Sequence, residues 1–341
     1  MVHSIKRPAD FHFESVRLVV LNSNRQIRQA QVSHLFQHGF RDITDTDRLS
    51  EVADRLKGDG ADLLIASIHD NADYSAAALL RQLRHNEIGK NPFLVATFLT
   101  ANAAVDSVRA LMDSGPDAIL ATPVSVGEIF SRVMGLVQKR KPFVVTSEYI
   151  GPDRRSQNGR DGSEKVPLID VPNPLRAKAT GQSMGELANH IRDVTQTITK
   201  LRIERAARQI QFVGNRLPTL SLNQADRPAV VADFDRMTAA LVLFRRLIPD
   251  TPFQAIEPAA ARLAGALEAL GNDPTLGTIG ARKNIESLAQ TIYGKVESLH
   301  RQMPAGAPGF IAPWRISPDT SIRRRSVATV ISHRYTCLGK R

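Results

Sequence analysis

Apolar runs rich in β-branched residues alternate with segments of helical periodicity along the first 140 residues. The apolar runs, bounded by turn-forming residues, predict strands at 16–21, 40–44, 62–68, 92–99 and 117–121. Apolar positions at three- and four-residue spacing predict helices at 27–36, 49–56, 76–83, 105–112 and 126–137. Five βα repeats of this kind predict an α/β fold with a doubly wound, flavodoxin-like parallel sheet in strand order 2-1-3-4-5.

The pattern changes after this unit. Residues 142–182 contain several prolines and glycines, which interrupt helices and central strands, and this predicts an extended linker. The same helical spacing then predicts helices at 183–213, 230–248, 259–270 and 279–299, which together form a separate α-helical bundle. We therefore expect an N-terminal extension (1–15), a sheet domain (16–141), a linker (142–182), a helical domain (183–302) and a disordered tail (303–341).

Two of the predicted helices carry long apolar seams. Leu187, Ile191, Val194, Ile198 and Leu201 follow alternating steps of four and three residues. Such a seam packs against other helices of the same chain or against a second copy. A homodimer through helices 183–213 and 279–299 is therefore one hypothesis.

The net charge of +11 is unevenly distributed. Residues 1–141 hold 17 basic against 16 acidic side chains, and residues 142–303 hold 21 against 17. Residues 304–341 hold 7 against 1, so more than half of the excess lies on the tail. Because the folded part is nearly neutral, nucleic-acid binding is disfavoured except as an alternative function of the tail.

The cysteine count and the lengths of the apolar runs predict the compartment of the protein. Cys337 is the single cysteine, so neither an internal disulfide nor a thiolate metal cluster is expected. The sequence shows no apolar run long enough for a membrane span and no signal-peptide pattern, so we expect a cytoplasmic protein without a membrane partner.

Polar residues follow several of the predicted strands, where the crevice of a doubly wound sheet lies. In chain order they are Asn22, Ser23, Ser67 near the end of its strand, Thr100 and Thr122, and Pro123 comes directly after Thr122. The order of elements, the loop lengths and Thr122-Pro123 after the fifth strand resemble the receiver domain of bacterial two-component response regulators. The linker, with its Tyr149–Arg155 and Val171–Lys178 segments, is similar to extensions in some alphaproteobacterial receiver-like proteins.

The resemblance implies a role for each position of this crevice. It places Asn22 and Ser23 at the family's acidic pair and Ser67 at its phosphoacceptor aspartate. Thr100 matches the switch hydroxyl, Thr122 replaces the lysine, and Pro123 matches the usual proline. Four of the five chemical positions differ, and every change removes charge. Because Mg²⁺ prefers carboxylate ligands and a hydroxyl without a base is a poor nucleophile, these changes predict a pseudo-receiver without a metal, a cofactor or catalytic residues.

Two alternatives to this prediction stay open. Asp70 and Asp73, in the loop after the third strand, are candidates for a displaced phosphoacceptor in a phosphorylation-dependent regulator. Nucleic-acid binding through the basic tail is the other. The main hypothesis is a non-enzymatic, receiver-like signalling protein of two-component (phosphorelay) type that works independently of phosphorylation and binds a histidine kinase or another signalling protein. The resemblance places its contact surface on the receiver face from Val105 to Val137.

Overall fold

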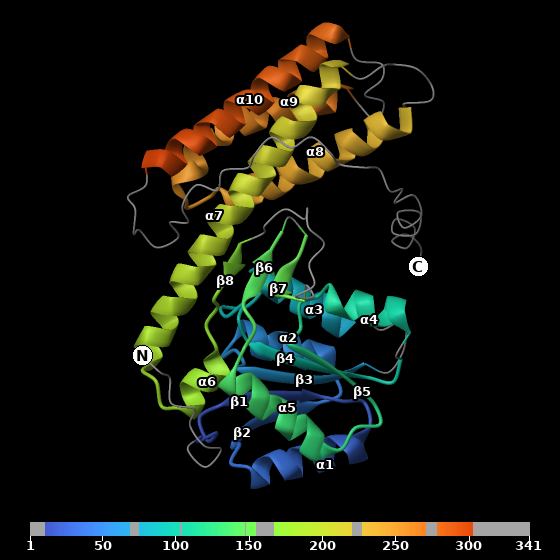
Figure 1. Cartoon of the computed structure of the whole chain (residues 1–341), viewed down its shortest axis with the longest axis vertical. Helices are drawn as coiled ribbons and strands as arrows, with labels where there is room; N and C mark the ends of the chain where they lie inside the picture. The colour runs from blue at the N-terminus through green and yellow to red at the C-terminus, as the bar shows by residue number, and fades with distance from the viewer. Residues whose placement is uncertain are drawn as a thin grey trace. The chain divides into compact units, whose positions relative to one another are not determined.

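The first domain is built on a five-stranded parallel sheet. The computed structural model describes residues 11–68, 75–102, 104–146, 148–154, 167–219, 227–270 and 278–302. The strands are β1 (Arg17–Leu21), β2 (Asp42–Thr46), β3 (Leu63–Ile68), β4 (Val95–Thr100) and β5 (Ala118–Ala121). They are hydrogen-bonded in the order β2-β1-β3-β4-β5, all parallel (Figure 1). The predicted fold class and strand order are thereby confirmed.

Helices cover both faces of this sheet. They are α1 (Arg25–Gln37), α2 (Leu49–Lys57), α3 (Ser75–Arg84), α4 (Val105–Met112) and α5 (Val126–Gln138). Successive strand side chains point to opposite faces, so Leu18 and Val20 pack with α1 and α5, whereas Val19 and Leu21 pack with α2 and α3. The second strand begins at Asp42 and not at Phe40 as predicted, since the Phe40 N–H donates to the carbonyl oxygen of Leu35 in α1 at 3.2 Å. The Phe40 ring is buried and stacked on Phe13, with 4.6 Å between the ring centroids.

The segment predicted as an extended linker is folded where it is described. It forms a small antiparallel sheet of β6 (Phe143–Val145), β7 (Ile150–Pro152) and β8 (Leu168–Ile169) in the order β7-β6-β8. The short helix α6 (Pro174–Ala179) follows. The prolines do not prevent this structure because Pro152 ends a strand and Pro174 occupies the first turn of the helix, where no amide donor is needed.

A buried carboxylate joins this added sheet to the first domain. Asp117 lies immediately before β5. Its Oδ1 accepts from Nε of Arg140 at 2.7 Å, and its Oδ2 accepts from Nη2 of Arg84 at 3.1 Å. Both guanidinium groups lie over the ring of Phe143 in β6. Burial lowers the pKa of Arg84 to about 10, partly offset by Asp117, so the side chain stays charged at neutral pH.

Close backbone contact and a second ion pair complete this attachment. A Cβ on Gly115, whose φ is +79°, would lie 2.4 Å from the carbonyl oxygen of Ile150, so only glycine allows β7 to approach here. Lys178 of α6 contacts Asp62, which precedes β3, at 2.7 Å. Both aspartates precede their strands, so the added segment is held at the amino-terminal edge of the five-stranded sheet.

The second half of the chain is a helical bundle with its own core. Its helices are α7 (Met184–Arg216), α8 (Arg227–Leu247), α9 (Glu257–Leu270) and α10 (Ile279–Gln302). The short 3-10 segments η2 (Leu217–Thr219) and η3 (Pro252–Ile256) lie between them. Residues of all four helices meet in one apolar cluster, as the periodicity predicts.

The seams that suggested a homodimer are buried inside one chain. Ile210 of α7 and Ile285 and Ile292 of α10 belong to the same core. Leu187 and Val194 near the start of α7 are also buried. A homodimer through helices 183–213 and 279–299 stays a prediction.

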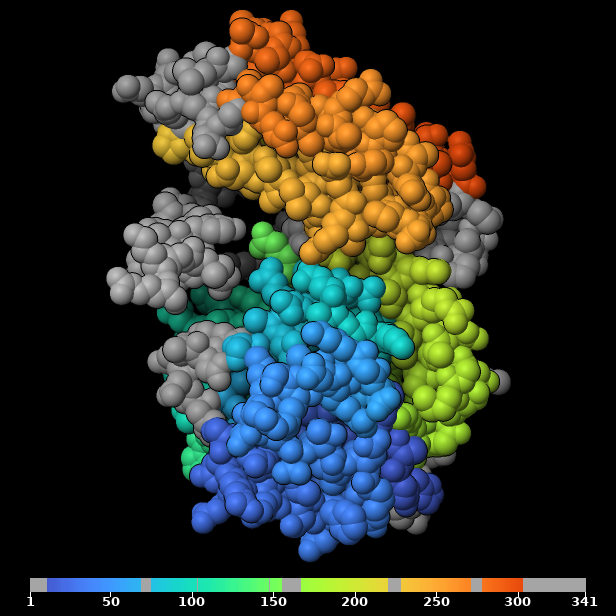
Figure 2. Space-filling view, turned by 180° about the vertical axis from the view of Figure 1, so that it is seen from behind, coloured from blue at the N-terminus to red at the C-terminus, as the bar shows by residue number. Residues whose placement is uncertain are grey.

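The long helix α7 contacts both the added sheet and the end of α3. Arg202 donates from Nη1 to the carbonyl oxygen of His85 at 3.2 Å, and its Nη2 lies 2.9 Å from Nδ1 of the same residue. Arg205 donates to the carbonyl oxygen of Val145 in β6. In Figure 2 the yellow-green residues of α7 run beside the cyan residues that follow α3. In the part of the chain that is described, no helix is both long enough and apolar enough to cross a bilayer.

We predict that replacing Asp117 destabilises the whole sheet domain. Asp117→Asn leaves two buried guanidinium groups without their counter-ion, and loss of one partner of such a network costs about 3–5 kcal/mol. The measurement is urea unfolding followed by circular dichroism. Asp106→Asn is the control because Asp106 is 97% exposed in its pair with Arg109 and should leave the midpoint unchanged. Similar midpoints for both variants would contradict the role assigned to Asp117.

We predict that the contact between Arg202 and His85 weakens in acid. Burial first, then the neighbouring Arg202, lowers the pKa of His85 from 6.5 to about 4. Between these values the unfolded chain binds a proton that the folded chain excludes, so stability falls as the pH drops through this window. The melting temperature should therefore fall less steeply with decreasing pH in His85→Gln than in the unmodified chain. The glutamine amide oxygen can still accept a hydrogen bond from Arg202. Equal slopes in both proteins would contradict this prediction.

Candidate functional site

The predicted crevice residues lie at the carboxyl-terminal edge of the five-stranded sheet. Asn22 follows β1, Ser67 is near the end of β3, Thr100 ends β4 and Thr122 follows β5. In the register of the sheet, Leu99 pairs with Ser67 and Ala121 pairs with Thr100. The topology therefore brings these polar positions to one edge, opposite to the edge that holds the added sheet.

Asn22 and Ser67 contact each other directly. Nδ2 of Asn22 donates to Oγ of Ser67 at 2.8 Å. The Asn22 side chain is 1% exposed, and its Oδ1 accepts the backbone N–H of Asn24 at 2.9 Å. The amide thus bridges the Ser67 hydroxyl and the turn that starts α1, where Asn24 caps the helix by accepting from the Ile27 amide.

Neither of these groups can take a proton from the other. The Asn22 contact directs an amide N–H toward Ser67 Oγ, and an amide nitrogen has no lone pair available for general-base catalysis. A serine hydroxyl needs an adjacent base, a metal or a lowered pKa to act as a nucleophile. The pair can therefore hold the strands β1 and β3 together at this edge, but it does not activate the hydroxyl.

Arg28 and Gln31 of α1 are parts of the site that sequence reasoning did not identify. Arg28 donates from Nη1 to the carbonyl oxygen of Asn22 at 2.5 Å and from Nε to Asp45 at 3.2 Å. Gln31 is buried, and its Oε1 lies 3.5 Å from Nδ2 of Asn22. Their spacing of three residues places them on one face of α1, which is the only sequence signal that could have indicated them.

The other crevice positions are arranged around the ends of β4 and β5. Oγ1 of Thr100 accepts the backbone N–H of Asn102 at 3.2 Å, and the N–H of Thr122 donates to the carbonyl oxygen of Thr100 at 2.8 Å. The Thr122-Pro123 peptide bond is cis. Ser23 and Pro123 are exposed. The Thr100 hydroxyl thus shapes the loop that leads to α4.

Asp70 and Asp73, the displaced acceptors of the alternative hypothesis, lie outside the described residues. Within the described ranges, no group of three or more His, Cys, Asp or Glu side chains is placed to hold a metal ion. Asp45 lies beside the crevice on β2 and is paired with Arg28. Its charge is therefore already matched by a cation of the same domain.

The face formed by α4, β5 and α5 is the surface that the family resemblance connects with partner binding. β5 is an edge strand of its sheet, paired on one side with β4. Val105 in the first turn of α4 is 72% exposed, which is the largest exposed fraction among the large hydrophobic residues of the described chain. The helix α5 begins with a capping box between Ser125 and Glu128, which fixes its start close to the end of β5.

Comparisons with solved structures cover 35–36% of this chain. No family model matches this chain, and no curated protein matches it. Solved structures that match include an orphan response regulator of H. pylori (17% identity, TM-score 0.32) covering 36% of this chain and 97% of that one. A response regulator from Thermotoga maritima matches with 18% identity and TM-score 0.32, over 36% of this chain and 98% of that one.

A third solved structure comes from a protein described as pilus assembly-related. It is from Burkholderia pseudomallei and matches with 17% identity and TM-score 0.30, over 35% of this chain and 87% of that one. We base the fold assignment on the strand order and the register of the sheet itself.

Proposed function

We propose that this chain is a receiver-like signalling protein that works without aspartyl phosphorylation and acts by binding another protein. The observation that carries the proposal is the hydrogen bond between Asn22 and Ser67, at the positions where the resemblance implies an acidic residue and a phosphoacceptor. Two neutral side chains satisfy each other where charged ones would bind a cation. The edge of the sheet is therefore organised for internal contacts.

Electrostatics support the same conclusion. Transfer of a phosphoryl group to a carboxylate requires a divalent cation that offsets the charge of both groups, and Mg²⁺ is held by carboxylate oxygens. Here the cation beside the crevice is Arg28, which contacts the carbonyl oxygen of Asn22 and the carboxylate of Asp45. An arginine fixed in this position supplies constant charge that does not depend on a metal or on phosphorylation.

The proposed contact surface is the face of α4, β5 and α5, from Val105 to Val137. An exposed valine in the first turn of α4, beside an edge strand, offers apolar area that a partner protein buries on binding. The amino-terminal edge of the sheet is occupied by β6–β8 and α6, and α6 also packs against the last turns of α5, where Asn173 donates to the carbonyl oxygen of Leu136. A histidine kinase or another signalling protein is the class of partner proposed.

We expect the full chain to remain unmodified when it is incubated with acetyl phosphate and Mg²⁺. The measurement is intact mass spectrometry, with a phosphorylatable response regulator treated in parallel as the positive control. Mg²⁺ alone should not raise the melting temperature, because a ligand stabilises only a folded state that binds it.

One result would replace this proposal by the alternative. A phosphoryl adduct that disappears in Asp70→Asn or Asp73→Asn would identify a displaced acceptor and a phosphorylation-dependent regulator. An adduct on Ser67 would contradict the inactivity assigned to its hydroxyl.

We also expect Val105→Glu to weaken binding of the partner protein, because the substitution places a charge in the apolar centre of the proposed contact. The partner is first identified by cross-linking with the full chain, and its affinity is then measured for purified variants. Ile27→Glu is the matched control, since Ile27 is 47% exposed on α1, outside the proposed face. Equal losses in both variants, or a loss only in Ile27→Glu, would show that the partner binds elsewhere. Binding that disappears when residues 304–341 are removed would favour a function of the basic tail.

A further inference from the structure

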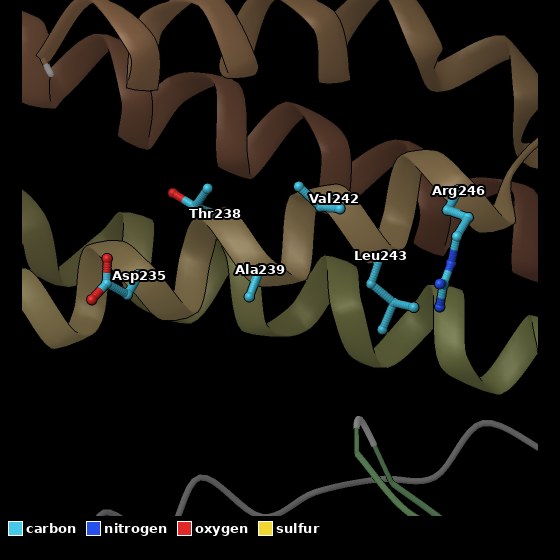
Figure 3. A pocket seen from close by; sticks show the side chains of 6 residues that line it. All are labelled: Asp235, Thr238, Ala239, Val242, Leu243 and Arg246. Carbon is cyan, nitrogen blue, oxygen red and sulfur yellow. The ribbon is translucent and has the colours of Figure 1, made fainter. Parts of the chain in front are cut away.

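One face of α8 points away from the core of the helical domain. The opposite face contributes Met237, Leu241 and Phe244 to that core. The outward face lines a shallow hollow, and Figure 3 shows its side chains spaced along the helix. Its lining residues are Asp235, Thr238, Ala239, Val242, Leu243 and Arg246. Leu243 is half-buried and also packs against the core, whereas the other five are exposed. Val242 is 64% exposed, a large value for an aliphatic side chain in the middle of a 21-residue helix.

The charges on this face of α8 are complementary to those on the same face of a second, antiparallel α8. Asp235 and Arg246 lie at its two ends, with Ala239 and Val242 between them (Figure 3). Around the midpoint of this row, the positions fall into three pairs: Asp235 with Arg246, Thr238 with Leu243, and Ala239 with Val242. A second α8 lying antiparallel would therefore place an acidic end against a basic end twice, with apolar side chains at the centre.

The spacing agrees with helix pairing of this kind. Asp235, Ala239, Val242 and Arg246 are separated by steps of four, three and four residues, which is the a/d spacing of a coiled-coil seam. The seam is also bounded on both sides. Arg236 pairs with Asp233 at 2.9 Å, and Arg245 pairs with Glu257 at 2.7 Å, so the flanking cations are matched within their own chain.

We infer that this face of α8 binds a second copy of the chain in an antiparallel, two-fold symmetric contact. A two-fold interface uses the same patch on both subunits, so the patch must match its own reverse, as this one does. Arg246 also contacts Glu87 at 2.9 Å, and its five guanidinium donors leave it able to bind a partner carboxylate as well. The inference does not depend on the receiver face or on phosphorylation.

The test is a charge exchange between two variants of the full chain. In Asp235→Arg, each end of the paired helices would bring two cations together, and in Arg246→Glu each end would bring two anions together. Each variant should dimerise at least about tenfold more weakly than the unmodified chain in a sedimentation concentration series. An equimolar mixture of the two should recover the affinity, because both ends are then complementary, and native mass spectrometry identifies the mixed dimer.

Matched charge changes elsewhere control for general effects on the bundle. Glu268→Arg and Arg262→Glu make the same reversals at exposed positions of α9 and should leave dimerisation unchanged. Circular dichroism confirms that every variant retains its helices. An unmodified chain that stays monomeric over the series, or single variants that dimerise as well as it does, would overturn the inference.

Cross-linking tests the direction of the helices independently. In a Cys337→Ser background, Ala239→Cys and Val242→Cys should form disulfides when the two variants are mixed, because these positions face each other across the two-fold axis. Each variant alone should cross-link less. More efficient cross-linking of a single variant with itself would indicate parallel helices and would contradict the antiparallel contact.

Discussion

The structure depends most on one buried carboxylate. Asp117 lies between Arg84 of α3 and Arg140, which follows α5, and its position before β5 brings these three parts of the sheet domain together. The same two arginines donate to the carbonyl oxygens of Pro92, Phe93 and Leu94, so they also fix the entry to β4. Burying two cations beside one anion is costly, and the hydrogen bonds of both guanidinium groups to Asp117 and to these carbonyl oxygens offset part of that cost. Both guanidinium groups lie over the ring of Phe143, and this contact holds β6 against the buried carboxylate.

The two ends of the parallel sheet consequently have different roles. At the amino-terminal edge, Asp117 and Asp62 attach the added sheet and α6, and through them the chain continues into α7. At the carboxyl-terminal edge, where ligands of such folds bind, Asn22 and Ser67 are neutral and contact each other, and Arg28 is paired with Asp45. Buried ion pairs thus attach the added segment at one edge, whereas the described residues of the other edge include no cluster of three or more acidic, His or Cys side chains.

Much of the fold could be predicted because it depends on local patterns. The five strands and the helices between them each bury a continuous run or a periodic face, and a single sequence shows both directly. The folded state of residues 142–152 was missed because it depends on contacts with residues far along the chain. Nothing in Gly115 or Gly151 alone indicates that their backbones meet, and nothing in Asp117 indicates which arginines reach it. Likewise, the identity of Asn22 and Ser67 was visible, but their mutual hydrogen bond depends on the spacing of β1 and β3 in the sheet.

A recognition surface that does not depend on phosphorylation needs another way to control how strongly it binds. The number of chains in the assembly can provide this control, since two linked surfaces bind a clustered or dimeric partner far more tightly than one surface does. The helical domain is suited to this purpose because its core already buries the seams of α7 and α10 and leaves the outward face of α8 exposed. Arg202 and Arg205 tie α7 to the end of α3 and to β6, so a contact made by the bundle is connected to the sheet domain through fixed hydrogen bonds. If both proposals hold, association through α8 presents two copies of the proposed contact surface in one assembly, with affinity set by protein concentration.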